Sequence, residues 1–193
     1  MRKSIFTAFL VSFFQLVIAQ QFTLQSSITF TGVNYGSNKC AGFVDVNNDN
    51  WLDVFFSGGI DIIGIEGFTG IYTNNGNNTF TPLAGLPVAD FFSDEVDWMD
   101  FNNDGYIDFL ISSGGQTFSL SDGTHLLKNN GNSTFTEVFY IPRGAALAWG
   151  DYNNDGLTDF TLGEGAYYTS PYTVQLYMNL GDTTFVPDTN NVF

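Results

Sequence analysis

The stretch DFNNDGYID at residues 100–108 occurs in three versions along the chain and decides the fold. The other two versions are DVNNDNWLD at 45–53 and DYNNDGLTD at 151–159, so the three start 55 and 51 residues apart. Each is followed by a second shared motif, which reads IYTNNGNNTF at 71–80, LLKNNGNSTF at 126–135 and LYMNLGDTTF at 176–185. Two matched motifs that recur three times in the same order identify an array of repeats.

Each repeat is predicted to form four short strands. Apolar segments rich in aromatic residues flank every Asp-rich stretch and are bounded by glycine, which is typical of buried strands rather than helices. The NNG turns at 74–76 and 129–131 supply residues that tolerate a positive φ, as tight hairpins require. Four-stranded units of about 50 residues predict an all-β chain of three propeller-type blades. The repeats are expected at about 40–88, 95–142 and 146–190.

The Asp-rich stretches carry the chemistry. Positions 1, 5 and 9 are Asp and position 3 is Asn, and hard cations such as Ca²⁺ bind several such oxygen ligands at once. We expect position 7 to add a backbone carbonyl and position 9 to close the site. Position 6 needs a left-handed backbone, which Gly105 and Gly156 adopt freely and which Asn50 also tolerates. The alternative interpretation is a turn that reverses the chain without a metal. A helical EF-hand is disfavoured, because its position 12 needs Glu and here falls on Phe56, Ile111 and Leu162.

These motifs resemble the FG-GAP/VCBS repeat family, whose members form the calcium-binding blades of integrin-α-like propellers. The resemblance covers about residues 41–188 and implies up to three calcium ions, one in each loop. The first implied ligand set is Asp45, Asn47, Asp49, the Trp51 carbonyl and Asp53. The second set is Asp100, Asn102, Asp104, the Tyr106 carbonyl and Asp108, and the third is Asp151, Asn153, Asp155, the Leu157 carbonyl and Asp159.

Composition excludes several classes of function. Of the 193 residues, 20 are acidic and only 5 are basic, which argues against binding to nucleic acid or to an anionic membrane. A single cysteine and a single histidine exclude a disulfide framework and a Cys/His zinc site. His125 is expected to be an ordinary surface residue. With no evident constellation of acid–base groups, the chain is predicted not to be an enzyme.

The first residues predict export. Arg2 and Lys3 precede an apolar run from Ile5 to Ala19, which is typical of a signal peptide at 1–19 and is short for a membrane span. The remaining 20–193 would then be secreted or attached to the cell surface, with no transmembrane span after cleavage.

The family resemblance implies a role in adhesion or in recognition of an extracellular protein or glycan, with calcium as a structural ion. The variable stretches 60–69, 116–124 and 164–173 are candidate contact loops. The alternative is an accessory or scaffold fragment of an extracellular enzyme, such as a polysaccharide lyase, glycosidase or phospholipase. Closed propellers usually have about 4–8 blades, so three repeats predict either part of a longer propeller or a homo-oligomeric ring.

Overall fold

The computed structural model describes residues 37–59, 68–88, 93, 95–112, 123–142, 145–166 and 169–192. The predicted signal peptide, most of the loops at 60–69 and 116–124, and the side chains of 164–173 lie outside this described part. Within it, every regular element is a β-strand. Over the same residues, no helix of the length and apolarity needed to cross a membrane is found.

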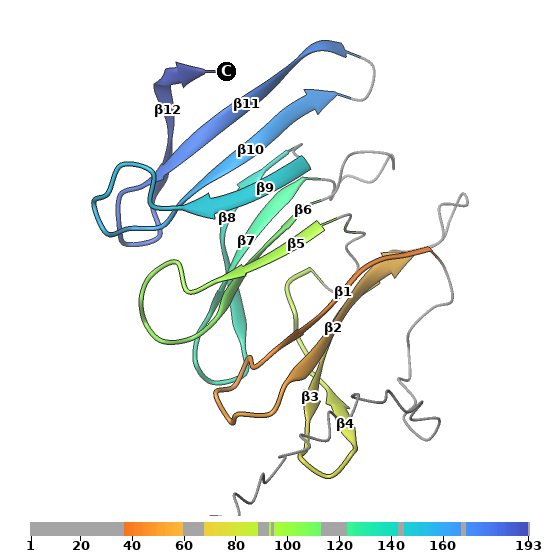
Figure 1. Cartoon of the computed structure of the whole chain (residues 1–193). Helices are drawn as coiled ribbons and strands as arrows, with labels where there is room; N and C mark the ends of the chain where they lie inside the picture. The colour runs from red at the N-terminus through yellow and green to blue at the C-terminus, as the bar shows by residue number, and fades with distance from the viewer. Residues whose placement is uncertain are drawn as a thin grey trace, which may run out of the picture.

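The twelve strands form three four-stranded antiparallel sheets, one for each repeat (Figure 1), which confirms the predicted all-β, blade-like fold. In each sheet the strands lie side by side in chain order. The first sheet contains β1 (Ser37–Val44), β2 (Asp53–Gly59), β3 (Phe68–Asn74) and β4 (Phe80–Pro82). The second contains β5 (Glu95–Met99), β6 (Asp108–Ser112), β7 (Thr124–Asn129) and β8 (Phe135–Ile141). The third contains β9 (Ala145–Gly150), β10 (Asp159–Ala166), β11 (Thr169–Asn179) and β12 (Phe185–Val192).

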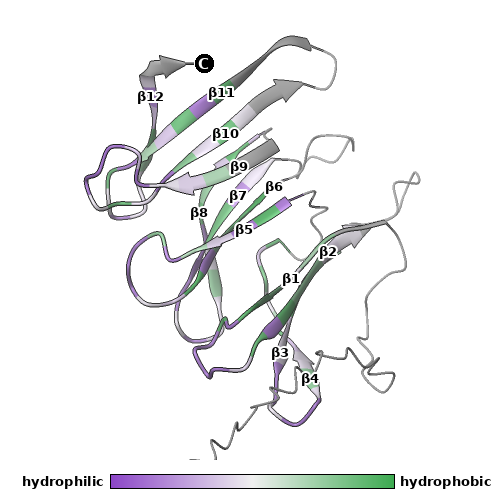
Figure 2. Ribbon diagram, viewed as in Figure 1, coloured by the Kyte–Doolittle hydropathy of each residue, from purple (hydrophilic) through white to green (hydrophobic). Residues whose placement is uncertain are grey.

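The sheets stack face to face, and their first strands lie next to one another, with β5 in contact with both β1 and β9 (Figure 1). The three Asp-rich stretches are the loops that join the first and second strands of each sheet. They emerge at the same edge of the stack, where the ribbon is mostly hydrophilic, whereas the strands between them carry the apolar residues (Figure 2). The fold therefore gathers the polar loops on one side of the apolar layers between the sheets.

The core consists of two layers, one between the first and second sheets and one between the second and third sheets. Along β6 the side chains alternate, so that Phe109 and Ile111 pack in the layer with the first sheet and Leu110 packs in the layer with the third. All three are fully buried. The first layer holds Val44, Val46, Phe55, Ile71, Leu86, Val88, Phe109, Ile111, Leu127 and Phe135. The second layer holds Phe101, Leu110, Leu126, Phe160, Leu162, Tyr177 and Phe185.

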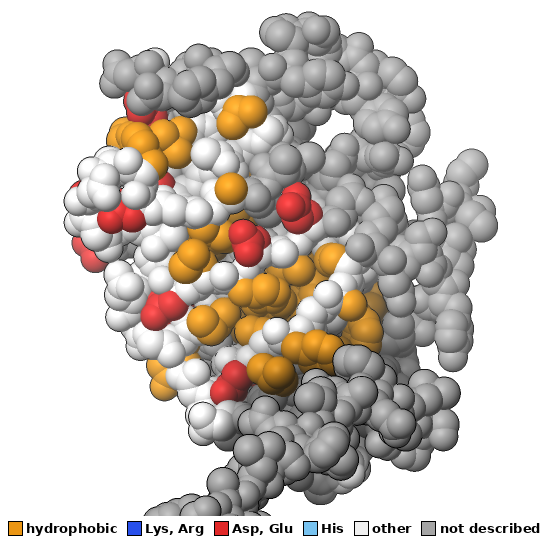
Figure 3. Space-filling model, in the orientation of Figure 1, with side chains coloured by type: hydrophobic (Ala, Val, Ile, Leu, Met, Phe, Trp, Pro, Cys, Tyr) orange, Lys and Arg blue, Asp and Glu red, His pale blue; other side chains and the backbone are white. Residues whose placement is uncertain are grey.

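The two outer faces of the stack carry different side chains at equivalent places. Phe55, Leu110 and Thr161 occupy equivalent places in the ladders, since each pairs with the matching residue of the third strand. Phe55 faces the second sheet and Leu110 faces the third sheet, whereas Thr161 faces outward from the third sheet. At the opposite end, Phe43 stands where the second and third sheets have Trp98 and Trp149, and it is 71% exposed. Hydrophobic side chains gather on the face over β1 and β5 (Figure 3).

Candidate functional site

The three Asp loops, 45–53, 100–108 and 151–159, have the same backbone conformation. Positions 4 and 6 both adopt a positive φ in every loop. At position 6, Asn50 has φ 69°, close to the 86° of Gly105 and the 88° of Gly156. The expectation that asparagine substitutes for glycine at this place is therefore confirmed. At position 4, φ is 58° for Asn48, 57° for Asn103 and 58° for Asn154.

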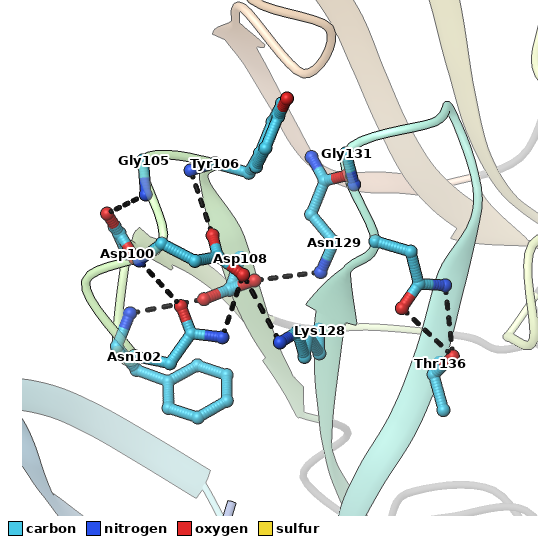
Figure 4. A network of polar contacts seen from close by, with 12 residues as sticks. Asp100, Asn102, Gly105, Tyr106, Asp108, Lys128, Asn129, Gly131 and Thr136 are labelled. Carbon is cyan, nitrogen blue, oxygen red and sulfur yellow. Dashed lines mark hydrogen bonds and ion pairs between the residues drawn. The ribbon is translucent and has the colours of Figure 1, made fainter. Parts of the chain in front are cut away.

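The first carboxylate of each loop lies at its centre. In the second loop, Oδ1 of Asp100 accepts a hydrogen bond from the N–H of Asp104 at 3.0 Å, and Oδ2 accepts one from Gly105 at 2.8 Å (Figure 4). Asp45 and Asp151 accept the same two bonds in their own loops, at 2.8 to 3.1 Å. The chain therefore winds around a carboxylate in all three repeats.

Positions 3 and 5 turn toward the same interior. Oδ1 of Asn102 accepts the N–H of Asp104 at 3.1 Å, while its Nδ2 donates to Oδ2 of Asp104 at 3.0 Å. Oδ1 of Asp104 in turn accepts the N–H of Tyr106 at 3.0 Å. The same three contacts recur in the other loops, through Asn47 and Asp49 and through Asn153 and Asp155. Three oxygen-bearing side chains are thus held close together in a strictly repeated pattern.

The last carboxylate of each loop is buried and ties the loop to the hairpin of the same sheet. Oδ2 of Asp108 accepts the N–H of Phe101 at 3.1 Å, and Oδ1 accepts the N–H of Asn129 at 2.7 Å. Asp108 has no exposed surface, and the same is true of Asp53 and Asp159, which make the equivalent pairs of bonds. Position 9 therefore has a structural task in this fold whether or not it also contacts a metal.

Burial changes the ionisation of this carboxylate. Loss of solvent raises the pKa of Asp108 to about 7, against the lowering effect of the two N–H donors and with a further rise from Asp104 and Asp100. Burial also raises the pKa of Asp53 above its ordinary value. Asp104 is different: burial raises its pKa, but the Tyr106 N–H and the Lys128 ammonium lower it further, and the net shift is downward. A bound cation would favour the ionised form of all three.

We expect the metal-free chain to become less stable relative to an Asp108→Asn variant as the pH rises from about 4 to about 7. The folded-state pKa of Asp108 lies above the ordinary 3.8, so the folded state holds more protons than the unfolded state across this window. Stability must then fall as the pH rises. Melting temperatures in a chelating buffer, measured for both proteins at half-unit steps, give the comparison. The prediction is contradicted if the difference in melting temperature between the two proteins stays constant with pH, or if the wild type becomes relatively more stable as the pH rises.

One asparagine that the sequence predicts only as part of a turn has a second role in the structure. Asn129, at the end of β7, is fully buried, and its Nδ2 donates to the carbonyl of Val46 in the first sheet at 2.7 Å. Asn179 in the third sheet likewise donates to the carbonyl of Phe101 in the second at 3.2 Å. Both carbonyls belong to position 2 of an Asp loop. The signal was the recurrence of Asn at 74, 129 and 179, four residues into each hairpin motif.

These two asparagines connect the first loop to the second repeat and the second loop to the third repeat. The same Nδ2 atoms also donate within their own sheets, to the carbonyls of Ile107 and Thr158 at 3.2 and 3.1 Å. A second connection joins the first two loops directly, because Nδ2 of Asn48 donates to the carbonyl of Gly105 at 2.8 Å. The loops and the contacts between sheets therefore form one polar network.

The expectation of an ordinary surface position for His125 is wrong. Its side chain is 9% exposed, with Nδ1 3.0 Å from Oε2 of Glu137 and its ring 4.7 Å from that of Tyr140. These partners lie on β8, across the ladder from β7, and the bulge in that ladder accommodates the pairing. The histidine thus belongs to the packing of the second sheet.

The donors of each loop suit a hard cation such as Ca²⁺. They are carboxylate, amide and backbone carbonyl oxygens, and a carboxylate oxygen that accepts one N–H retains capacity for another partner. Across the described ranges, no three Asp, Glu, His or Cys side chains already stand in an arrangement that could hold a metal.

The family model of the FG-GAP-like repeat matches the chain twice, at residues 45–111 and 100–162. Each match begins at the first Asp of a loop and ends in the second strand of the following sheet, so the matched unit spans a contact between sheets. Neither a curated protein nor a solved structure matches the chain.

Proposed function

Because the chain belongs to the FG-GAP-like repeat family, we propose that it is an extracellular recognition module that binds calcium through its Asp loops and a protein or glycan through its variable loops. FG-GAP repeats are typical of extracellular and cell-surface proteins, and they suggest an integrin-like recognition module. The observation that supports calcium best is the bonding of the first carboxylate, which accepts N–H groups from positions 5 and 6 in all three loops.

Calcium in this proposal is a structural ion. The side chains of positions 1, 3 and 5, the carbonyl of position 7 and the carboxylate of position 9 would hold it in each loop. Three carboxylates confined to one loop repel one another, and a divalent cation removes that repulsion. The ion stabilises the folded state, because the unfolded chain offers no assembled site. The module is proposed to act without catalysis of its own.

Removal of calcium is expected to lower the melting temperature by about 5–10 °C for each loop that loses its ion. A free calcium concentration about 100-fold above the dissociation constant stabilises a folded protein by about 2.7 kcal/mol per site. For a chain of this size, each kcal/mol corresponds to about 2–4 °C. Differential scanning calorimetry in millimolar calcium and in excess chelator measures the difference.

A triple variant, Asp45→Asn, Asp100→Asn and Asp151→Asn, provides the control. It keeps the shape of the central residue and removes one charge from each loop, so its melting temperature should respond much less to calcium. Equal melting temperatures of the wild type in calcium and in chelator would refute the proposed calcium sites.

The recognition part of the proposal is tested by binding. We expect the chain, in millimolar calcium, to bind a subset of glycans on an array or of purified extracellular matrix proteins, and to lose that binding in chelator. Family membership supports this part, through the role that such repeats have in extracellular recognition. Absence of binding to both panels would argue against it without affecting the calcium proposal.

A further inference from the structure

The second Asp loop differs from the other two by a positive charge placed against it. Nζ of Lys128, on β7, lies 3.2 Å from Oδ2 of Asp104, the side chain at position 5 of the loop (Figure 4). Both side chains are about one-third exposed, at 30% and 31%. The ammonium therefore neutralises one carboxylate of this loop from within the protein.

The lysine has no counterpart in the other two repeats. Lys128 pairs across the ladder with Thr136. The equivalent pairs are Thr73 with Thr81 in the first sheet and Met178 with Val186 in the third. Threonine and methionine carry no charge, so the hairpin of the second sheet alone presents a cation to its loop at this place.

A cation at this place competes with calcium. Oδ2 of Asp104 also accepts the Nδ2 of Asn102, so Lys128 and Asn102 are two donors on one oxygen. Calcium must displace the ammonium from this oxygen, or bind with it nearby and experience its repulsion. Neither penalty applies in the first and third loops, whose backbone and hydrogen bonds are otherwise the same.

We infer that Lys128 is a built-in counter-ion that makes the second loop the weakest of the three calcium sites. This inference rests on the proposed function, because it presupposes calcium in the loops. It divides the three loops into two kinds: the first and third depend on calcium for charge balance, and the second is partly balanced by the protein. The second loop should therefore fill last, at up to about fivefold higher calcium than the tightest loop.

The test is a calcium titration of the chain followed by ¹H–¹⁵N NMR, because the amide at position 6 reports on each loop separately. The three reporters are Asn50, Gly105 and Gly156, whose N–H groups bond to the central carboxylates. In the wild type we expect Gly105 to reach half-saturation last. In Lys128→Met, which introduces the residue of the third repeat, the midpoint of Gly105 should fall by up to about fivefold while those of Asn50 and Gly156 stay unchanged.

A reciprocal variant makes the result independent of any damage to the second sheet. Thr73→Lys places the ammonium in the first repeat and should raise the midpoint of Asn50 alone. Unchanged midpoints in both variants, with calcium bound to all three loops, would overturn the role of Lys128 and leave the calcium sites intact. No response of any reporter to millimolar calcium would instead overturn the calcium sites, and the role of Lys128 with them.

Discussion

Replacement of Phe109 by alanine is expected to lower the free energy of unfolding by about 3–5 kcal/mol. The ring of Phe109 has no exposed surface and lies between two sheets. Its centroid is 6.0 Å from that of Phe55 in the first sheet, and 5.1 and 5.2 Å from those of Trp98 and Phe135 in its own. Alanine would leave a cavity at the contact between repeats, since the surrounding rings belong to two rigid ladders. Urea unfolding of both proteins measures the loss.

Phe43→Ala is the matched control for this prediction. The same atoms are removed, but the ring of Phe43 is 71% exposed, so the expected change is about 0.5 kcal/mol or less. If the two variants lose similar stability, the layer between the first and second sheets is not the core that the structure indicates.

Replacement of Asn129 by alanine is expected to lower the free energy of unfolding by about 2–4 kcal/mol. The amide donates to the carbonyls of Val46 and Ile107, and its Oδ1 accepts the N–H of Gly131 at 3.0 Å. Alanine leaves these groups buried with no partner from this side chain, and an unsatisfied buried polar group costs about 1–3 kcal/mol. Urea unfolding again measures the change, and hydrogen exchange should show faster opening of the contact between the first two sheets.

Asn74→Ala is the control in the first repeat. This asparagine donates only within its own sheet, to the carbonyl of Leu52 at 3.1 Å, in an exposed contact. Its removal should therefore have a smaller effect, of about 1 kcal/mol. Asn179→Ala, which breaks a contact between sheets, should behave like Asn129→Ala. A loss in Asn129→Ala no larger than in Asn74→Ala would show that the bond between sheets adds nothing to stability.

Much of the fold could be predicted because the same two motifs recur three times in the sequence. The aromatic and glycine-bounded segments around each Asp loop are short, and the loops recur at similar intervals of 55 and 51 residues, so four strands per repeat followed from local pattern and period alone. The left-handed conformation of Asn50 could also be predicted, because position 6 of the loop requires a positive φ and asparagine tolerates one.

Contacts between separate elements, within one repeat or across two repeats, could not be predicted in this way. The pattern in 126–135 shows that Asn129 begins a turn, but the carbonyl that it binds is 83 residues away in the chain. His125 was misjudged for the same reason, because its partner Glu137 meets it only through the register of β7 and β8. The pairing of Lys128 with Asp104 likewise depends on how a hairpin end lies against a loop. Residues whose role comes from strand register, from the placement of a hairpin against a loop or from the stacking of sheets leave little trace in local sequence.

Both outer faces of the stack leave apolar side chains that a further sheet could cover. Places that hold Val44, Phe55 and Val46 in the first sheet hold Gly150, Thr161 and Tyr152 in the third, and the hydroxyl of Tyr152 donates to Asp188 at 3.0 Å. The same face of β11 also carries Val174, which pairs with Gly163 and is 44% exposed. A further sheet placed against β1–β4 would cover Phe43, which is likewise exposed. Burial of apolar surface therefore favours lengthening of this array, within one chain or between chains, at either outer face of the described sheets.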